Sequence, residues 1–137
     1  MTLEQAFQKA VEVRERAHAP YSKFHVGAAL KVKGHDELCL GCNVENASYG
    51  GTICAERSAV LQAVAKYGKF EPEYLVLVTG SSTPDSPCGF CLQVLSEFVS
   101  ADFKIHLSTL KGIQKTVSFK ELLPRPFDNS NLPATKG

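Results

Sequence analysis

The chain has 137 residues, 44% of them hydrophobic, which is long enough for one compact domain with a core and too short for two. Its 15 Lys and Arg nearly balance 14 Asp and Glu, and neither sign of charge forms a long block. This excludes the charge pattern of a nucleic-acid-binding or membrane-binding protein and favours a small, freely diffusing substrate. The longest apolar run, 75–78, is far too short to span a bilayer and no signal peptide opens the chain, so we expect a cytoplasmic protein.

The first part of the chain predicts a helix followed by a β-hairpin. Apolar residues at helical spacing predict a helix over 3–17, and Thr2 with Gln5 fits a capping box at its start. Residues 21–33 and 37–44 are typical of two strands joined by a two-residue turn whose first central residue is a glycine.

The middle of the chain predicts a second helix and a buried strand. A helical pattern begins at Thr52 and stops before Gly68, so Cys54 and Glu56 are expected in its first turn. The run 74–78 is apolar without alternation, which indicates a strand covered on both faces near the middle of a sheet.

The last part predicts a βαβ unit and an edge strand. Ser86 as N-cap and Pro87 at the first helical position predict a third helix over 87–99, followed by a strand over 103–107. The strands on either side of this helix should be parallel and their crossover right-handed. An edge strand is expected over 115–119.

Together these elements predict an α/β fold, a three-layer α/β/α sandwich around a mixed sheet of about five strands. We expect a single domain over 1–127 that ends soon after a short helical turn at 121–123. The remaining segment, 128–137, is polar without periodicity and is expected to be a disordered C-terminal tail.

The most informative residues are three cysteines and a glutamate. Cys54 lies two residues before Glu56, and Cys88 and Cys91 follow Pro87. Three thiolates can hold one tetrahedral Zn²⁺ per chain and leave one position open for water, with Glu56 beside it as a proton carrier, whereas a structural zinc normally fills all four positions. An odd total of five cysteines without an export signal also favours reduced thiols or metal ligands over disulfides.

The predicted helix positions of Cys54, Cys88 and Cys91 favour the thiolate form of each side chain. Free N–H groups and the positive dipole end in the first turn of a helix favour thiolate. Residues i and i+3 face the same way, so Cys88 and Cys91 can chelate together while Cys54 approaches from another helix. Three thiolates leave a net negative charge, and Arg57 is the candidate to offset it by donating to the ligand sulfurs.

Other interpretations of the cysteines stay open. Cys88 and Cys91 at a helix start also fit the dithiol of a thiol–disulfide oxidoreductase, and a zinc-binding module without catalysis is a further alternative. Cys39 and Cys42 could complete a closed Cys₄ zinc site, but residues at this spacing on a regular strand face opposite sides, and we expect both to be buried as apolar residues.

Other catalytic motifs are missing from the sequence. It contains no nucleophile elbow, P-loop or dinucleotide fingerprint. The histidines show no pairing suited to a metal or a triad and are interpreted as ordinary surface or loop residues: His18, His25, His35 and His106.

Five segments of the chain carry a likeness to a known family: 19–24, 26–29, 43–49, 52–58 and 87–91. Through them the chain resembles the small homotetrameric, zinc-dependent cytidine deaminases of the three-cysteine type over residues 3–127. Relatives acting on deoxycytidylate, guanine or transfer RNA generally carry His at the first ligand position, so Cys54 favours the free-nucleoside family. Two residues depart from the family pattern, because His25 stands where Pro is frequent and Leu92 where Arg is frequent.

The resemblance implies a cytidine deaminase-like catalytic domain, zinc as cofactor, a nucleoside substrate, no nucleic-acid or membrane partner, and a homotetramer. The implied reaction is hydrolytic deamination of cytidine and deoxycytidine to uridine and deoxyuridine with release of ammonia, in pyrimidine salvage. Glu56 would take a proton from the attacking water, give it to ring N3 and carry a second proton to the departing amino group.

Residues near the predicted strand and helix ends are candidates for binding a nucleoside. Asn43 and Glu45 lie two apart, so both side chains can reach a ribose hydroxyl, although an ordinary polar strand end would look the same. The resemblance assigns both to the ribose and Phe24, otherwise a core residue, to packing against the pyrimidine. The backbones of Ala55 and Ser86, at two helix starts, are expected to bind the base edge.

In such tetramers neighbouring subunits add residues to each site, and the matching positions are Ala47, Tyr49 and Phe127.

Overall fold

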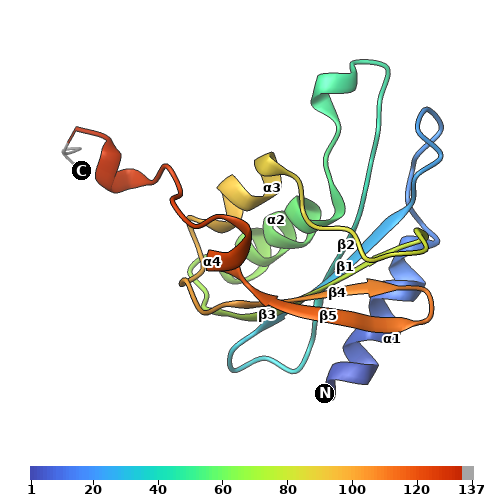
Figure 1. Cartoon of the computed structure of the whole chain (residues 1–137), viewed down its shortest axis with the longest axis horizontal. Coiled ribbons are helices and arrows are strands. Elements are labelled where there is room, and N and C mark those ends of the chain that lie inside the picture. Colours follow the sequence, from blue (N-terminus) through green and yellow to red (C-terminus); the bar gives the residue numbers. More distant parts are fainter. Residues whose placement is uncertain (134–137) are drawn as a thin grey trace.

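The computed structural model describes residues 1–133, within which five strands form one mixed sheet (Figure 1). The strands are β1 (Val26–Val32), β2 (Cys39–Cys42), β3 (Pro72–Thr79), β4 (Lys104–Thr109) and β5 (Gly112–Ser118), and the helices are α1 (Leu3–Arg14), α2 (Ala55–Tyr67), α3 (Gly89–Leu95) and α4 (Phe119–Leu122). The strand order is β2-β1-β3-β4-β5, with β3 and β4 parallel and every other pair antiparallel. This confirms the expected mixed α/β sheet, including the parallel βαβ pair and the edge strand β5.

The central place of β3 follows from its apolar sequence. Leu75, Val76, Leu77 and Val78 are each at most 2% exposed. Because successive strand residues face opposite sides, Leu75 and Leu77 join one apolar cluster while Val76 and Val78 join another. Only a strand with neighbours on both edges and helices on both faces can bury such a run.

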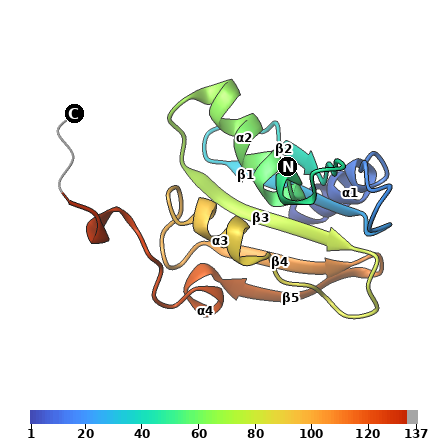
Figure 2. The same cartoon turned by 90° about the horizontal axis from the view of Figure 1, so that it is seen from above.

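Helices cover both faces of the sheet, which gives the expected three layers, and Figure 2 looks down on the face that carries α2 and α3. α1 buries Ala6, Phe7 and Ala10 in the cluster that contains Val76 and Val78. α2 and α3 pack on the opposite face, where they contribute Ala55, Ala59, Val60, Ala63, Leu92 and Leu95 to the larger cluster.

The start of α1 and the end of α2 follow the sequence signals, whereas α1 ends at Arg14 instead of residue 17 and α2 begins at Ala55 instead of Thr52. Thr2 and Gln5 form the expected capping box at the start of α1. α2 ends at Tyr67, and Gly68 follows with a φ of 69°, a conformation that glycine adopts without steric cost. Cys54 is the N-cap of α2, one position before the first turn in which it was predicted, and Glu56 lies in that turn as expected.

The hairpin between β1 and β2 is confirmed, but its predicted turn is wrong. The Val32 carbonyl accepts from the His35 N–H, so Lys33 and Gly34 are the central residues of the turn. Gly34 has a φ of 82°, which suits glycine in the third position of such a turn. β1 also begins five residues later than predicted, because residues 21–25 fold into a turn held by Glu45.

The predicted start of α3 is also wrong. Cys88 is the N-cap and Gly89 the first helical residue, so Ser86 and Pro87 lie in the preceding loop. The loop is fixed by a hydrogen bond of 2.6 Å from Thr79 Oγ1 to Asp85 Oδ2, a tertiary contact that local capping signals do not reveal. The regular helix ends at Leu95 instead of residue 99.

His106 is not a surface or loop residue, contrary to the sequence interpretation. It lies in β4 between two other strands and is 9% exposed. Its Nδ1 lies 2.8 Å from Thr116 Oγ1 on β5, and its ring meets Tyr74 edge to face with centroids 5.6 Å apart. Burial lowers the pKa of His106, and the nearby charge of Lys104 lowers it further.

The segment expected to be a disordered tail begins with a 3₁₀ turn. Asp128 caps residues Asn129–Asn131, and residues 134–137 lie outside the described part of the chain. Within residues 1–133, none of the helices combines the length and apolar character that a membrane span requires.

Candidate metal and substrate site

Three cysteine sulfurs converge where the N-termini of α2 and α3 meet. Cys54 Sγ lies 3.9 Å from Cys88 Sγ, which lies 3.7 Å from Cys91 Sγ. Zn–S bonds of about 2.3 Å place neighbouring sulfurs of a tetrahedral site about 3.8 Å apart. The donor set therefore fits zinc with three thiolate ligands. Among residues 1–133, these three form the group of donors close enough to share a metal, and Cys39 and Cys42 do not join it.

The two helix starts explain how the sulfurs converge. Cys54 and Cys88 are both N-cap residues with extended backbone, and neither uses its side chain to cap its helix. The sulfurs are therefore free to turn toward each other. Cys91 is fully buried on the inner face of the first turn of α3.

The environment favours a thiolate at Cys54. Its pKa falls to about 5, first because the Cys91 thiol donates to it and then because the guanidinium of Arg57 does. The pKa of Cys91 moves in the opposite direction, because it holds the shared proton and is buried.

Arg57 lies beside the sulfur cluster, at the position from which it can offset negative charge. Its Nη2 donates to the Thr52 carbonyl at 2.9 Å and to Cys54 Sγ at 3.7 Å. The guanidinium also lies over the ring of Phe90, 5.7 Å from the centroid. Arg57 thus ties the start of α2 to the loop before it.

Glu56 is a buried carboxyl in the wall of a pocket. Only 5% of the residue is exposed. Burial, followed by the negative charge of Cys54, raises the pKa of Glu56 to about 7. Such a group can accept and return a proton near neutral pH.

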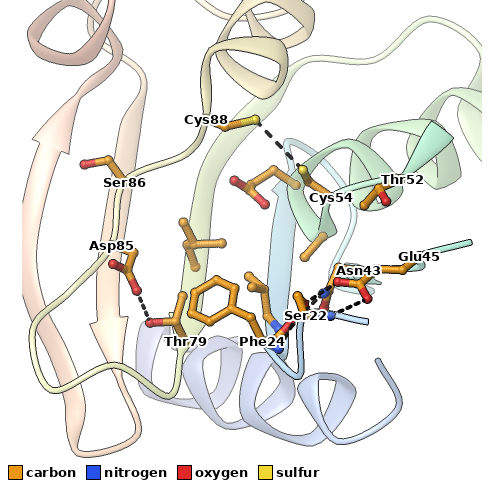
Figure 3. A pocket seen from close by; sticks show the side chains of 14 residues that line it. Ser22, Phe24, Asn43, Glu45, Thr52, Cys54, Thr79, Asp85, Ser86 and Cys88 are labelled. Carbon is orange, nitrogen blue, oxygen red and sulfur yellow. Dashed lines mark hydrogen bonds between the residues drawn. The ribbon is translucent and has the colours of Figure 1, made fainter. Parts of the chain in front are cut away.

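The pocket that Glu56 lines has a volume of about 300 Å³, which is at the small end of ligand sites and suits a single small molecule. Figure 3 shows Cys54 and Cys88 at one end, Asn43 and Glu45 on one side, and Thr79 with Asp85 on the other. The wall is formed by the side chains or backbone of Ser22, Phe24, Val26, Asn43, Glu45, Thr52, Cys54, Ala55, Glu56, Leu77, Thr79, Asp85, Ser86 and Cys88.

Asn43 and Glu45 are buried and hold the segment that precedes β1. Asn43 Oδ1 accepts from the Val26 N–H at 2.9 Å, and its Nδ2 donates to the Phe24 carbonyl at 2.7 Å. Glu45 accepts from the N–H groups of Tyr21 and Ser22 and from the Ser22 hydroxyl. These bonds lower the pKa of Glu45, so it is a carboxylate.

The residues predicted to serve neighbouring subunits lie outside this pocket. Ala47 and Tyr49 are exposed on the segment between β2 and α2, and Tyr49 is 71% exposed. Phe127 is 58% exposed, and its carbonyl accepts from Gln93 Nε2 at 2.7 Å.

Several pocket residues were not predicted from the sequence. Ser22 contacts Glu45, and Thr79 and Asp85 form the hydrogen-bonded pair on the opposite wall. The polar Thr79 directly after a long apolar run was the available signal, since ligands often bind beyond the carboxyl ends of strands. Asp85 carried no signal of its own within a polar loop.

Comparison with known proteins gives consistent matches. Residues 1–107 match the family model described as the cytidine and deoxycytidylate deaminase zinc-binding region. The chain is 40% identical over 127 residues to a cytidine deaminase from Halalkalibacterium halodurans, and the match covers 93% of this chain and 95% of the relative. It is 39% identical over 132 residues to a cytidine deaminase from Sporosarcina psychrophila, and that match covers 96% of each chain. The crystal structure of cytidine deaminase from Burkholderia pseudomallei superimposes with a TM-score of 0.84 at 39% identity and covers 93% of this chain and 100% of that one.

Proposed function

Since this chain belongs to the family of cytidine and deoxycytidylate deaminases, we propose that it deaminates cytidine and deoxycytidine by hydrolysis, releasing ammonia. The observation that carries the proposal is one pocket that joins three convergent cysteine sulfurs to a buried glutamate. A dithiol oxidoreductase would need only Cys88 and Cys91 and would leave Cys54 and Glu56 without a role.

Zinc is the cofactor of this family's deaminase region, and Cys54, Cys88 and Cys91 would hold it. When bound, zinc acts as a Lewis acid that makes water nucleophilic near neutral pH. Arg57 would moderate the negative charge of the three thiolates through its hydrogen bond to Cys54.

Glu56 would carry the protons of the reaction. Its raised pKa allows the carboxylate to accept a proton from the attacking water and to deliver it to ring N3 of the pyrimidine. The same carboxylate would then take the proton of the new C4 hydroxyl and pass it to the amino group, which leaves as ammonia while the C4 carbonyl forms. Its burial keeps bulk water from competing for these protons.

The far end of the pocket offers hydrogen bonds for a ribose. Asn43 uses one amide hydrogen and its oxygen within the protein, which leaves its second N–H for a ligand. The Glu45 carboxylate accepts three hydrogen bonds and has room for one more from a hydroxyl. Phe24, which is 44% exposed beside them, would pack on the pyrimidine, and the backbones of Ala55 and Ser86 would bind the base edge.

We further propose that four copies assemble and that neighbouring copies complete each pocket. The exposure of Ala47, Tyr49 and Phe127 in the single chain supports this assignment, because it leaves all three free to contact a neighbouring copy. The enzyme would act on free nucleosides in the cytoplasm, in pyrimidine salvage.

The test is ammonia release and the accompanying ultraviolet change when cytidine is added to purified protein, repeated after chelation and after zinc is returned. We expect one zinc per chain and turnover that depends on it. Full activity in a metal-free sample, or a zinc-loaded protein that releases no ammonia from either nucleoside, would contradict the proposal. Sedimentation of the active protein tests the tetramer.

A further inference from the structure

Arg14, at the end of α1, lies outside the pocket but touches a loop that forms part of it. Its side chain is only 16% exposed. Nε donates to the His25 carbonyl at 3.0 Å, and Nη1 lies 3.0 Å from the carboxylate of Glu15, which is 68% exposed. His25 is the last residue before β1, so this bond fixes the end of the segment 19–25, here called the front loop.

The same guanidinium packs against a second loop. A Cβ placed on Gly80 would lie 2.5 Å from Arg14 Nη2, which means that the guanidinium rests directly on the glycine backbone. Gly80 is the first residue after β3 and opens the segment 80–88, here called the rear loop. One cation therefore contacts the point where the front loop ends and the point where the rear loop begins.

Both loops carry pocket residues. The front loop supplies Ser22 and Phe24, and the rear loop supplies Asp85, Ser86 and Cys88. The side chains of Asn43 and Glu45 already hold the front loop from the pocket side, whereas Arg14 holds its end from α1.

We propose that Arg14 is a positioning residue that sets the separation of the front and rear loops and thereby the width of the nucleoside pocket. This inference rests on the proposed function, since it concerns the same pocket. Because Arg14 acts through residues on the pocket wall, its loss weakens binding of substrate and product alike and leaves the chemical step largely intact.

The first experiment compares R14Q, R14K and R16Q. Arg16 is an exposed cation two residues away, so R16Q removes the same charge from a surface position. We expect R14Q to raise the KM for cytidine about tenfold, and to raise the Kd for uridine, measured by calorimetry, by the same factor. Its kcat should stay within about twofold of the wild-type value. A tenfold loss of affinity is about the size expected for the loss of a charge-assisted hydrogen bond. R14K keeps the positive charge and a hydrogen-bond donor but not the planar contact with Gly80, so its KM and Kd should fall between those of the wild type and R14Q. R16Q behaves as wild type.

The second experiment tests the contact between Arg14 and Gly80. In G80A the added Cβ displaces the guanidinium, so KM and Kd rise in the same direction as in R14Q. In an R14A background the obstacle is gone, and adding G80A changes neither constant further. Equal effects of G80A in both backgrounds would overturn the proposed coupling.

A wild-type KM and uridine Kd in R14Q would also overturn the inference. If R14Q lowers the melting temperature while both constants stay unchanged, Arg14 has a purely structural role. Failure of the proposed function looks different, because wild-type protein itself then releases no ammonia from cytidine.

Discussion

Cys54 and Cys88 occupy equivalent places, each as the N-cap of its helix, and their sulfur atoms lie 3.9 Å apart. N-cap residues usually use a side-chain oxygen to satisfy a free N–H of the first turn. Here the side chains are sulfur and make no such bond. Both helices thus lack the side-chain hydrogen bond that usually caps an N-terminus. Their N-termini instead lie beside the cysteine sulfurs, where the helix dipole favours the negative charge of a thiolate.

Replacing Glu56 by Gln should abolish turnover while leaving the metal site intact. The amide is nearly the same size but cannot accept and return a proton, so we expect kcat to fall by roughly 10³-fold. Ammonia release and zinc content, measured on the same sample, check this. A Glu56→Gln protein with one zinc per chain and nearly full activity would remove Glu56 from the mechanism.

Replacing Cys88 by Ala should remove the metal, whereas the same change at Cys39 should not. Cys88 belongs to the sulfur cluster, while Cys39 is fully buried in the apolar cluster beneath α2. We expect Cys88→Ala to hold far less than one zinc per chain and to be inactive. Cys39→Ala should keep its zinc and lose about 1 kcal/mol of stability to the smaller side chain. Zinc loss in both variants would instead favour a four-cysteine site.

The stability of the protein should fall in mild acid because of His106. Burial lowers its pKa in the folded state, so the unfolded chain binds more protons as the pH drops toward and below the ordinary value of 6.5. The stability that the neutral ring contributes is complete above that value and declines below it. Melting temperatures across this range should therefore depend less on pH in His106→Asn, which keeps a polar partner for Thr116.

His35→Gln is the matched control for that measurement. His35 is exposed in the hairpin loop, where its ring stacks on Tyr67 with centroids 4.0 Å apart. The variant should retain the acid sensitivity of the wild type. Identical pH profiles for His106→Asn and the wild type would show that another group controls acid stability.

Gly41→Ala should disturb both folding and the site. A Cβ on Gly41 would lie 2.3 Å from the Ala55 carbonyl and 2.5 Å from the Ala59 N–H, which are rigid backbone atoms of α2. β2 or the start of α2 must then shift, at a cost of about 2 kcal/mol or more. Gly50→Ala, where a Cβ meets nothing within 4 Å, should be nearly neutral. Chemical denaturation and zinc affinity of the two variants check the contrast.

Apolar periodicity was enough to predict the helices, the strands and the central place of β3, because burial on the two faces of the sheet dictates that pattern. The cysteine spacing together with the family resemblance pointed to the three sulfurs that meet, although the spacing alone left a dithiol and a four-cysteine site open. The start of α3 was missed because Ser86 and Pro87 are a common capping signal, whereas the loop is held by the distant Thr79. His106 was missed because a single strand does not reveal whether another strand will cover its side chain.

The contacts that shape the pocket depend on pairs far apart in the chain. Glu45 binds the backbone of Tyr21 and Ser22, and Arg14 reaches the carbonyl of His25. Neither pair leaves a periodic or compositional trace in a single sequence. They follow from the fold, once β1 has brought the ends of α1 and β2 together.

The separation of 34 residues between Cys54 and Cys88 has a consequence for biosynthesis. Cys54 leaves the ribosome first and stays without its sulfur partners until the helix that carries Cys91 has been made and packed. During that interval the Cys54 thiol is open to oxidants, and a wrong disulfide would trap the nascent chain before the metal arrives. The yield of folded, zinc-loaded protein in cells should therefore depend on the zinc supply and on reducing conditions during translation, even if the folded enzyme itself is stable to oxidation.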